Sequence, residues 1–275
     1  MDLLSEWKDW TPGKPPYMLD ADRETLESER SKKATITFKS WKKAFTDEAF
    51  CRPGDKKLHL GLLPQPFIGD ISRASIYVLS LNPGWGPHDY FGEYKVPEYR
   101  AALLANLKQR FDGTDFPFLL LDPRYSWGFR YWHRKLSAII LELSKKWEVS
   151  FADARRVLAS QLASIELVPY HSPTFHDGGG WLKRCELESV RLARTFVGEV
   201  AYPRVMAGDA IMIVLRKEKF WNLSEKPNKV IIYRGPQAQG AHLTPKSEGG
   251  AAILKVLEKL DPGKHSPKAR AGSRA

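Results

Sequence analysis

The chain has 275 residues, of which 43% are hydrophobic, enough for one large α/β domain or two small ones. No stretch approaches the roughly 18 apolar residues of a transmembrane helix, the N-terminus lacks the basic start and apolar run of a signal peptide, and two isolated cysteines, Cys51 and Cys185, exclude a disulfide framework and suit a reducing cytoplasm. The net charge of +11 favours a polyanionic partner, either nucleic acid or an acidic membrane surface, although a solvated surface with a basic tail would give the same balance.

The first part of the chain predicts an arm that packs on the core. Residues 1 to about 33 are polar and contain three prolines, which indicates a partly helical segment. The spacing of Trp41, Ala44, Phe45 and Phe50 predicts an amphipathic helix over 35–50. We therefore expect an N-terminal arm over 1–60, an α/β domain over 61–260 and a disordered basic tail over 261–275.

Strands and helices alternate over the rest of the chain. A Pro-rich loop over 60–67 leads to a first strand that ends at Leu81, and helical spacing predicts helices over 97–111, 131–147, 151–162, 182–196 and 248–260. Short apolar runs predict strands over 164–168, 204–206 and 230–233, whereas 116–121 favours strand or loop and 210–217 favours helix or strand. The alternation predicts a three-layer α/β/α fold with a central, mostly parallel sheet.

Polar loops follow three of the predicted strands. The first starts at 82–86 and carries aromatic residues as far as Phe91, the second covers 168–173, and the third covers 234–245. In a parallel sheet all three open at the same edge, where α/β folds bind ligands. They supply amides, imidazoles, aromatic rings and exposed backbone but few carboxylates, which suits recognition of a flat base and positioning of water.

Three motifs in these loops occur in an order that is typical of one family. Leu79–Gly84 reads Leu-Ser-Leu-Asn-Pro-Gly, Ile165–Tyr170 reads Ile-Glu-Leu-Val-Pro-Tyr, and Ala241–Pro245 reads Ala-His-Leu-Thr-Pro. They resemble the Gly-Met-Asn-Pro-Gly, Thr-Asn-Leu/Val-Val and His-Pro-Ser-Pro motifs of the uracil-DNA glycosylase superfamily, in its single-strand-selective and mismatch-specific branches. The resemblance covers about residues 70 to 260, but Ser80 replaces a common Gly and Glu166 an Asn that is usual in some branches.

The resemblance implies a monofunctional DNA glycosylase for DNA repair, which flips a deaminated or damaged base out and hydrolyses its N-glycosidic bond without metal or cofactor. In the family the first-motif Asn orients the attacking water, and that role falls on Asn82. The last-motif His supports the departing base as a neutral donor, and that role falls on His242. Phe91 or Tyr90 would stack on the flipped base.

Further residues of the loops are expected to contact the base or the DNA. The neighbouring family loop wedges into DNA, a role for Leu243. The expected base contacts are Gly84, Gly86, Tyr170 and His171, and the expected DNA contacts are Leu243, Thr244, Gln239 and Arg234.

Each of these residues also has a purely structural explanation. Asn82 could cap its own turn as Asx residues do, His242 could flank the last helix, and aromatic residues after a loop are often part of the core. His171, His176 and Asp177 could offer three metal ligands, but no other cluster completes a site and we expect none. Basic and aromatic residues alternate around one predicted helix, where they could hold nucleic acid or pack on the sheet: Trp127, Arg130, Tyr131, Trp132, Arg134, Lys135, Lys145 and Lys146.

The leading interpretation is a monomeric DNA glycosylase whose partner is DNA, with single-stranded DNA among the candidates. Two alternatives stay open because the motifs have diverged. One is a nucleic-acid-binding protein on the same fold that has lost excision, and the other is an α/β enzyme for small molecules whose basic surface is incidental.

Overall fold

The computed structural model describes residues 2–28, 31, 34–37, 42–43, 56–84, 86–174, 187–216, 218–226 and 228–260. Its main sheet has five strands in the order β3–β5–β4–β6–β7 and is mostly parallel, which confirms the predicted α/β fold. These strands are β3 (Phe67–Ile68), β4 (Ile76–Ser80), β5 (Leu162–Glu166), β6 (Ile211–Val214) and β7 (Val230–Ile232). A second, two-stranded parallel sheet pairs β1 (Thr35–Ile36) with β2 (Leu58–His59).

The chain divides into two compact units, each made of three separate segments. Unit 1 contains Met1–Phe67, Ser80–Lys108 and Ile165–Glu199, and unit 2 contains Ile68–Leu79, Gln109–Ser164 and Val200–Ala275. The expected boundary near residue 60 stays a prediction, and the expected basic tail over 261–275 lies outside the described residues.

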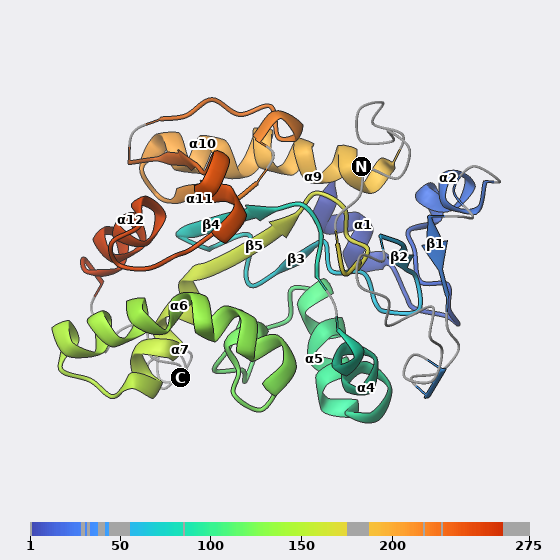
Figure 1. Ribbon diagram of the computed structural model, residues 1–275, viewed down its shortest axis with the longest axis horizontal. Coiled ribbons are helices and arrows are strands. Elements are labelled where there is room, and N and C mark those ends of the chain that lie inside the picture. Colours follow the sequence, from blue (N-terminus) through green and yellow to red (C-terminus); the bar gives the residue numbers. More distant parts are fainter. Residues whose placement is uncertain are drawn as a thin grey trace. The chain divides into compact units, whose positions relative to one another are not determined.

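Apolar strands form the centre of unit 2. β4 pairs with β6 and β6 with β7, both in parallel, so that Ile76 lies beside Ile211 and Met212 beside Val230. Every residue of β6 and β7 is buried, as expected for a parallel sheet that is covered on both faces. Figure 1 shows α6 and α7 on one side of β4 and α10 on the other. The helical elements of this unit are η2 (Leu119–Leu121), α6 (Ser126–Trp147), α7 (Phe151–Gln161), α10 (Tyr202–Ala207), η4 (Glu218–Phe220), α11 (Gly235–Gly240) and α12 (Glu248–Leu257).

The long helix α6 confirms the clearest periodicity in the sequence. Leu136, Ile139, Ile140 and Leu143 are all buried, so the stripe at i, i+3, i+4 and i+7 faces the core. The helix ends at Glu148, which adopts a left-handed conformation with φ of 54°.

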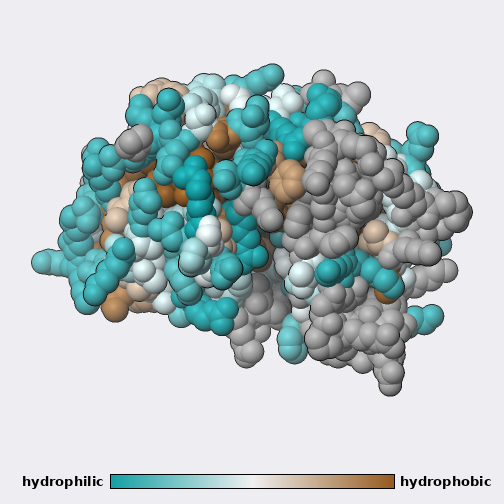
Figure 2. All heavy atoms as spheres, turned by 45° about the horizontal axis from the view of Figure 1, so that its top comes forward, coloured by the Kyte–Doolittle hydropathy of each residue, from teal (hydrophilic) through white to brown (hydrophobic). Residues whose placement is uncertain are grey.

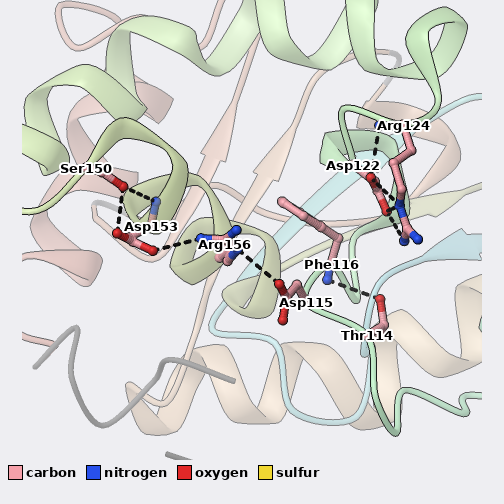
Figure 3. Close-up of polar contacts among 8 residues, drawn as sticks. All are labelled: Thr114, Asp115, Phe116, Asp122, Arg124, Ser150, Asp153 and Arg156. Carbon is pink, nitrogen blue, oxygen red and sulfur yellow. Dashed lines mark hydrogen bonds and ion pairs between the residues drawn. The ribbon is translucent and has the colours of Figure 1, made fainter. Parts of the chain in front are cut away.

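Ion pairs fasten α7 to the loop before η2 (Figure 3). Ser150 caps α7 by accepting a hydrogen bond from the Asp153 backbone N–H at 3.1 Å. Arg156 donates to Asp153 at 2.8 Å and to Asp115 at 3.1 Å, so its charge is neutralised twice. Arg124 pairs in the same way with Asp122, at 2.6 Å. Arg124 and Arg156 therefore both have acidic partners within the protein.

Unit 1 combines the N-terminal segment with helices from the middle of the chain. Its elements are α1 (Leu3–Asp9), η1 (Asp20–Asp22), α2 (Arg23–Glu27), α4 (Pro87–Lys95), α5 (Pro97–Leu107) and α9 (Glu188–Phe196), and a π-helical turn, η3 (Val197–Ala201), continues α9 into unit 2. α1 and η1 both pack against α9. Leu3 and Trp7 of α1 are buried, so the predicted, partly helical N-terminal segment forms part of the core of this unit.

Several sequence predictions about local structure are wrong. Thr35–Ile36 is the strand β1 instead of the start of a helix; the rest of that predicted helix lies largely outside the described residues. Residues 202–207 form the helix α10 and end at Gly208 with φ of 92°, where a short strand was expected. Residues 87–95 form the helix α4 where a loop was expected. Residues 116–121, for which strand or loop was left open, contain a 3-10 turn at 119–121.

Candidate functional site

The turn after β4 lies beside the segment that follows β5, within unit 1. Val168 N–H donates to Leu81 O at 2.8 Å and Ser172 N–H donates to Pro83 O at 3.2 Å, so Asn82 is held between two paired segments. β4 is also the strand at which the sheet order reverses, because the chain continues to β5 on one side of it and then to β6 on the other. Open α/β sheets bind ligands outside the carboxyl end of such a strand.

The side-chain amide of Asn82 is fixed through its nitrogen. Nδ2 lies 2.9 Å from Ser172 Oγ, 3.2 Å from Tyr170 O and 3.0 Å from Pro83 O. The Ser172 hydroxyl donates its own proton to Thr174 O at 3.0 Å, so it can only accept from Asn82. Because all three neighbours of Nδ2 are acceptors, the amide cannot turn over without placing oxygen against oxygen.

The oxygen of the same amide is left available. Asn82 is partly exposed, and no residue in the described part of the chain donates a hydrogen bond to its Oδ1. The nitrogen therefore serves the turn, as the structural explanation requires, whereas the oxygen is free to accept a hydrogen bond from water. A water-positioning role for Asn82 stays a prediction, and it now concerns one atom.

The residues that follow this turn form a helix for reasons that the sequence contained. Pro87 lies in the first turn of α4, where its missing N–H removes no helical hydrogen bond. Asp89 accepts the Gly86 N–H at 2.7 Å, which caps the same end. That N–H is consequently not available to a sugar-phosphate, so Gly86 is wrong as a ligand contact through its N–H. Gly84 is exposed and stays a candidate.

The two aromatic candidates for base stacking are separated by burial. The Tyr90 ring is fully buried, where it packs on Tyr94 with ring centroids 6.1 Å apart, so Tyr90 is wrong as a stacking residue. Phe91 is 39% exposed on α4 and stays the candidate.

Tyr170 and His171 are buried, and their side chains are wrong as base contacts. The Tyr170 hydroxyl donates to Asp22 Oδ2 at 2.6 Å. The ring nitrogens of His171 lie 3.1 Å from Gly84 O and 3.1 Å from Leu63 O. Burial lowers the pKa of His171 to about 4, although the two carbonyls favour the charged form. Both residues therefore hold the two paired segments in place.

A buried polar residue of α4 was missed by the sequence reasoning. Glu93 Oε2 accepts the Leu63 N–H at 2.8 Å and lies 3.7 Å from Arg100 Nη1, while Oε1 has no hydrogen-bond partner among the described residues. Burial raises the pKa of Glu93 to about 8. The spacing of Tyr90 and Glu93 at i and i+3 would have indicated a common buried face, had the helix been recognised.

The third loop lies in unit 2 and forms α11 followed by a turn. His242 is exposed, and its carbonyl accepts a hydrogen bond from the Tyr233 hydroxyl at 2.8 Å. A Cβ added to Gly240 would lie 2.5 Å from the His242 ring, so the imidazole rests against the glycine backbone. Leu243 is fully buried, so its predicted role as a wedge in DNA is wrong.

Two cations bind carbonyl groups of this turn, and the charge of a third, Arg134, acts on one of them. Lys135 donates to Gly240 O at 3.1 Å and to Ala241 O at 2.7 Å, and Arg216 donates to another carbonyl at the end of α11 at 3.3 Å. Burial, with the charges of Arg216 and Arg134, lowers the pKa of Lys135 to about 8. No carboxylate in the described part of the chain forms an ion pair with any of the three, in contrast to the arginines in Figure 3.

Two neighbouring aromatic residues of α6 differ in exposure, because one is buried and the other lies at the surface. Trp132 is buried and meets Phe118 edge to face, with ring centroids 5.0 Å apart, which is a packing role. Tyr131 is 43% exposed, and Lys135 Nζ lies 4.9 Å from its ring centroid. An exposed aromatic ring therefore lies next to the cations.

The other predicted DNA contacts of the third loop are exposed. Gln239 and Thr244 stay candidates. Arg234 is exposed too, but it pairs with Glu225 at 2.6 Å and with Glu218 at 3.5 Å, so much of its charge is already neutralised.

The described residues contain neither a cluster of metal ligands nor a helix that could span a membrane. Within the described ranges, no group of three His, Cys, Asp or Glu side chains is arranged to hold a metal ion, and His176 and Asp177 lie outside those ranges. No helix among the described residues is both long and apolar enough to cross a bilayer. On the face drawn in Figure 2, hydrophilic residues predominate over smaller hydrophobic areas.

Comparisons with protein-family models, with curated proteins and with solved structures gave no match.

Proposed function

We propose that the protein is a DNA glycosylase, which hydrolyses the N-glycosidic bond of a deaminated or damaged base. The observation that carries the proposal is the Asn82 amide, whose nitrogen is bound on three sides and whose oxygen has no donor among the described residues. It stands at the carboxyl end of the strand where the sheet order reverses.

The chemistry of such a site follows from the neutrality of the amide. Asn82 Oδ1 cannot remove a proton outright, but it can accept a hydrogen bond from water and direct the water oxygen at the sugar carbon. The water oxygen bonds to that carbon, the bond to the base nitrogen breaks, and the departing base takes up the proton that the water releases. The reaction consumes only water, and the rate gain comes from placement and from stabilised charge.

An exposed residue of the same unit as Asn82 supplies a further role in the proposal. Phe91 of α4 stacks on the extruded base. For His242 of unit 2, the role that the motif resemblance implies is a hydrogen bond to the departing base, and His242→Ala tests it.

The expected partner is DNA, and the cations of unit 2 support it. The charges of Arg134 and Arg216 both repel that of Lys135, no carboxylate in the described part of the chain pairs with any of the three, and phosphate groups would relieve that repulsion. Tyr131 beside them offers an exposed ring on which a base can stack. We expect the protein to act as a monomer in the cytoplasm.

The test is base release from single- and double-stranded oligonucleotides that contain uracil, hypoxanthine or an alkylated base. We expect release from at least one of them, and Asn82→Ala lowers the single-turnover rate about 100- to 1,000-fold. The control Gln237→Ala removes an exposed amide on α11 and leaves the rate unchanged.

Release that is as fast in Asn82→Ala as in the parent would refute the role of Asn82. Salt-dependent DNA binding without release of any base would support the binding protein that lacks excision, and Glu166 in place of the Asn usual in some branches fits that outcome.

A further inference from the structure

A buried carboxylate links the N-terminal segment to the turn that holds Asn82. Asp22 of η1 is fully buried, and its Oδ2 accepts the Tyr170 hydroxyl at 2.6 Å. Its Oδ1 accepts the Ser189 N–H at the start of α9, at 3.1 Å. The hydroxyl oxygen of Tyr170 in turn accepts a hydrogen bond from the Leu19 N–H at 3.2 Å. The ring of Tyr170 is thus held from the N-terminal segment at its hydroxyl end.

The same residue touches Asn82 at its other end. The Tyr170 carbonyl accepts from Asn82 Nδ2 at 3.2 Å, and Ser172, two residues later, supplies the closest acceptor at 2.9 Å. A shift of the Tyr170 backbone would therefore move two of the three acceptors around Asn82 Nδ2 and change the direction of Asn82 Oδ1.

Burial makes this link stiff. A carboxylate removed from water costs several kcal/mol unless hydrogen bonds compensate it, and Tyr170 and Ser189 provide them. If Asp22 moved away, the Tyr170 hydroxyl and the Ser189 N–H would lose their buried partner. The N-terminal segment and the second loop are consequently expected to dock as one piece.

We infer that Asp22 is a positioning residue for Asn82: through Tyr170, the docked N-terminal segment sets the direction of the amide oxygen that receives water. The inference rests on the proposed function for its catalytic consequence. It assigns residues 19–22, which the sequence motifs did not include, to the machinery of the site.

The experiment is a double-mutant cycle on single-turnover base release, with Asp22→Asn, Ser172→Ala and Asn82→Ala. Asn at position 22 keeps the shape, but its amide nitrogen cannot accept a second hydrogen bond. We expect Asp22→Asn and Ser172→Ala to lower the rate at saturating DNA about 10- to 100-fold, with half-saturation changed less than about twofold.

The cycle separates positioning from general damage. In an Asn82→Ala background, Asp22→Asn has no further effect if it acts through the Asn82 amide. Equal losses in both backgrounds, or a loss confined to DNA affinity, would overturn the inference. Asp20→Asn is the matched control, because Asp20 lies on the same 3-10 turn and is exposed; it leaves the rate unchanged. If Asp22→Asn does not fold, Tyr170→Phe supplies the remaining arm, because it removes only the hydroxyl that donates to Asp22, and an unchanged rate in that variant would overturn the inference.

A readout without catalysis keeps the inference separate from the proposed function. The side-chain amide protons of Asn82 are identified by NMR as the pair that disappears in Asn82→Ala. In Asp22→Asn they shift and exchange faster with solvent, whether or not the protein releases any base. Unchanged shifts and exchange in a folded Asp22→Asn would overturn the inference, while absent base release in the parent would contradict only the proposed function.

Discussion

The turn after β4 and the turn after α11 hold their polar residues in opposite ways. At Asn82 the side chain itself is bound, by three acceptors around its nitrogen. At His242 the backbone is bound, by the Tyr233 hydroxyl and by the buried Leu243 beside it, while the imidazole stays exposed. The first arrangement fixes the direction of one atom, whereas the second fixes where a side chain starts and leaves its end to solvent or ligand.

The largest expected effect concerns the anchor of the second turn. Leu243→Ala removes a fully buried side chain and should lower the free energy of unfolding by about 2–5 kcal/mol in urea denaturation. Leu141→Ala is the control, because Leu141 is 45% exposed on α6, and it should change stability by less than about 0.5 kcal/mol. A stable Leu243→Ala that binds DNA poorly would restore the wedge role.

The buried carboxyl group of Glu93, on the helix α4 that follows the first turn, should make the stability of the protein depend on pH. Burial raises the pKa of Glu93 from 4.5 to about 8, so the folded protein keeps a proton that the unfolded chain has lost. This contribution is complete below pH 4.5 and disappears as pH rises through 8. Glu93→Gln should therefore gain stability relative to the parent over this range, on the order of a few kcal/mol.

The measurement for Glu93 is urea denaturation of both proteins at several pH values between 4.5 and 9. Glu98→Gln, at an exposed position of α5, is the matched control for the loss of one carboxylate. A constant difference for Glu93→Gln would mean that Glu93 is ionised in the folded state near neutral pH.

Periodicity and loop position predicted the strands β4, β5 and β7 and the helices α5, α6, α7, α9 and α12, and they placed Asn82 at the end of β4. They failed where a local signal had two meanings. Pro87 and the aromatic residues after it suggested a loop, yet Pro at the first turn and Asp89 three residues after Gly86 start a helix. Because the helix was not recognised, Tyr90 was predicted to be exposed, whereas it is buried on α4.

Roles that depend on distant contacts could not be predicted from the sequence. Asp22 and Tyr170 are separated by 148 positions, and nothing in either neighbourhood indicates the other. Likewise, Leu243 looks like an exposed wedge within its motif, but its burial is decided by the packing of unit 2. Residue type and spacing predict which atoms could act; only packing decides which of them remain exposed.

A smaller effect on stability is expected at Gly240, where a substitution should move the His242 imidazole without moving the His242 backbone. In Gly240→Ala the new Cβ would lie 2.5 Å from the His242 ring, and the ring can rotate away at low cost because it is the exposed end of a flexible side chain. Stability should change by about 1 kcal/mol or less, while base release should fall as far as it does in His242→Ala. If Gly240→Ala releases base at the parent rate, the resting position of the imidazole has no part in the reaction.

The smallest expected effect tests whether the surroundings of the second turn attract DNA. Arg134 has no acidic partner among the described residues, whereas Arg156 pairs with Asp115 and Asp153. Arg134→Ala and Arg156→Ala remove the same charge from the same unit, so the long-range field changes alike. If Arg134 contacts a phosphate, its loss reduces the slope of log affinity against log salt by about 0.7–0.9, and the loss of Arg156 leaves the slope unchanged.

The measurement is fluorescence anisotropy with a single-stranded oligonucleotide at several salt concentrations, which gives the slope for each variant. Equal slopes in the two variants would mean that net charge alone attracts DNA and that Arg134 contacts no phosphate.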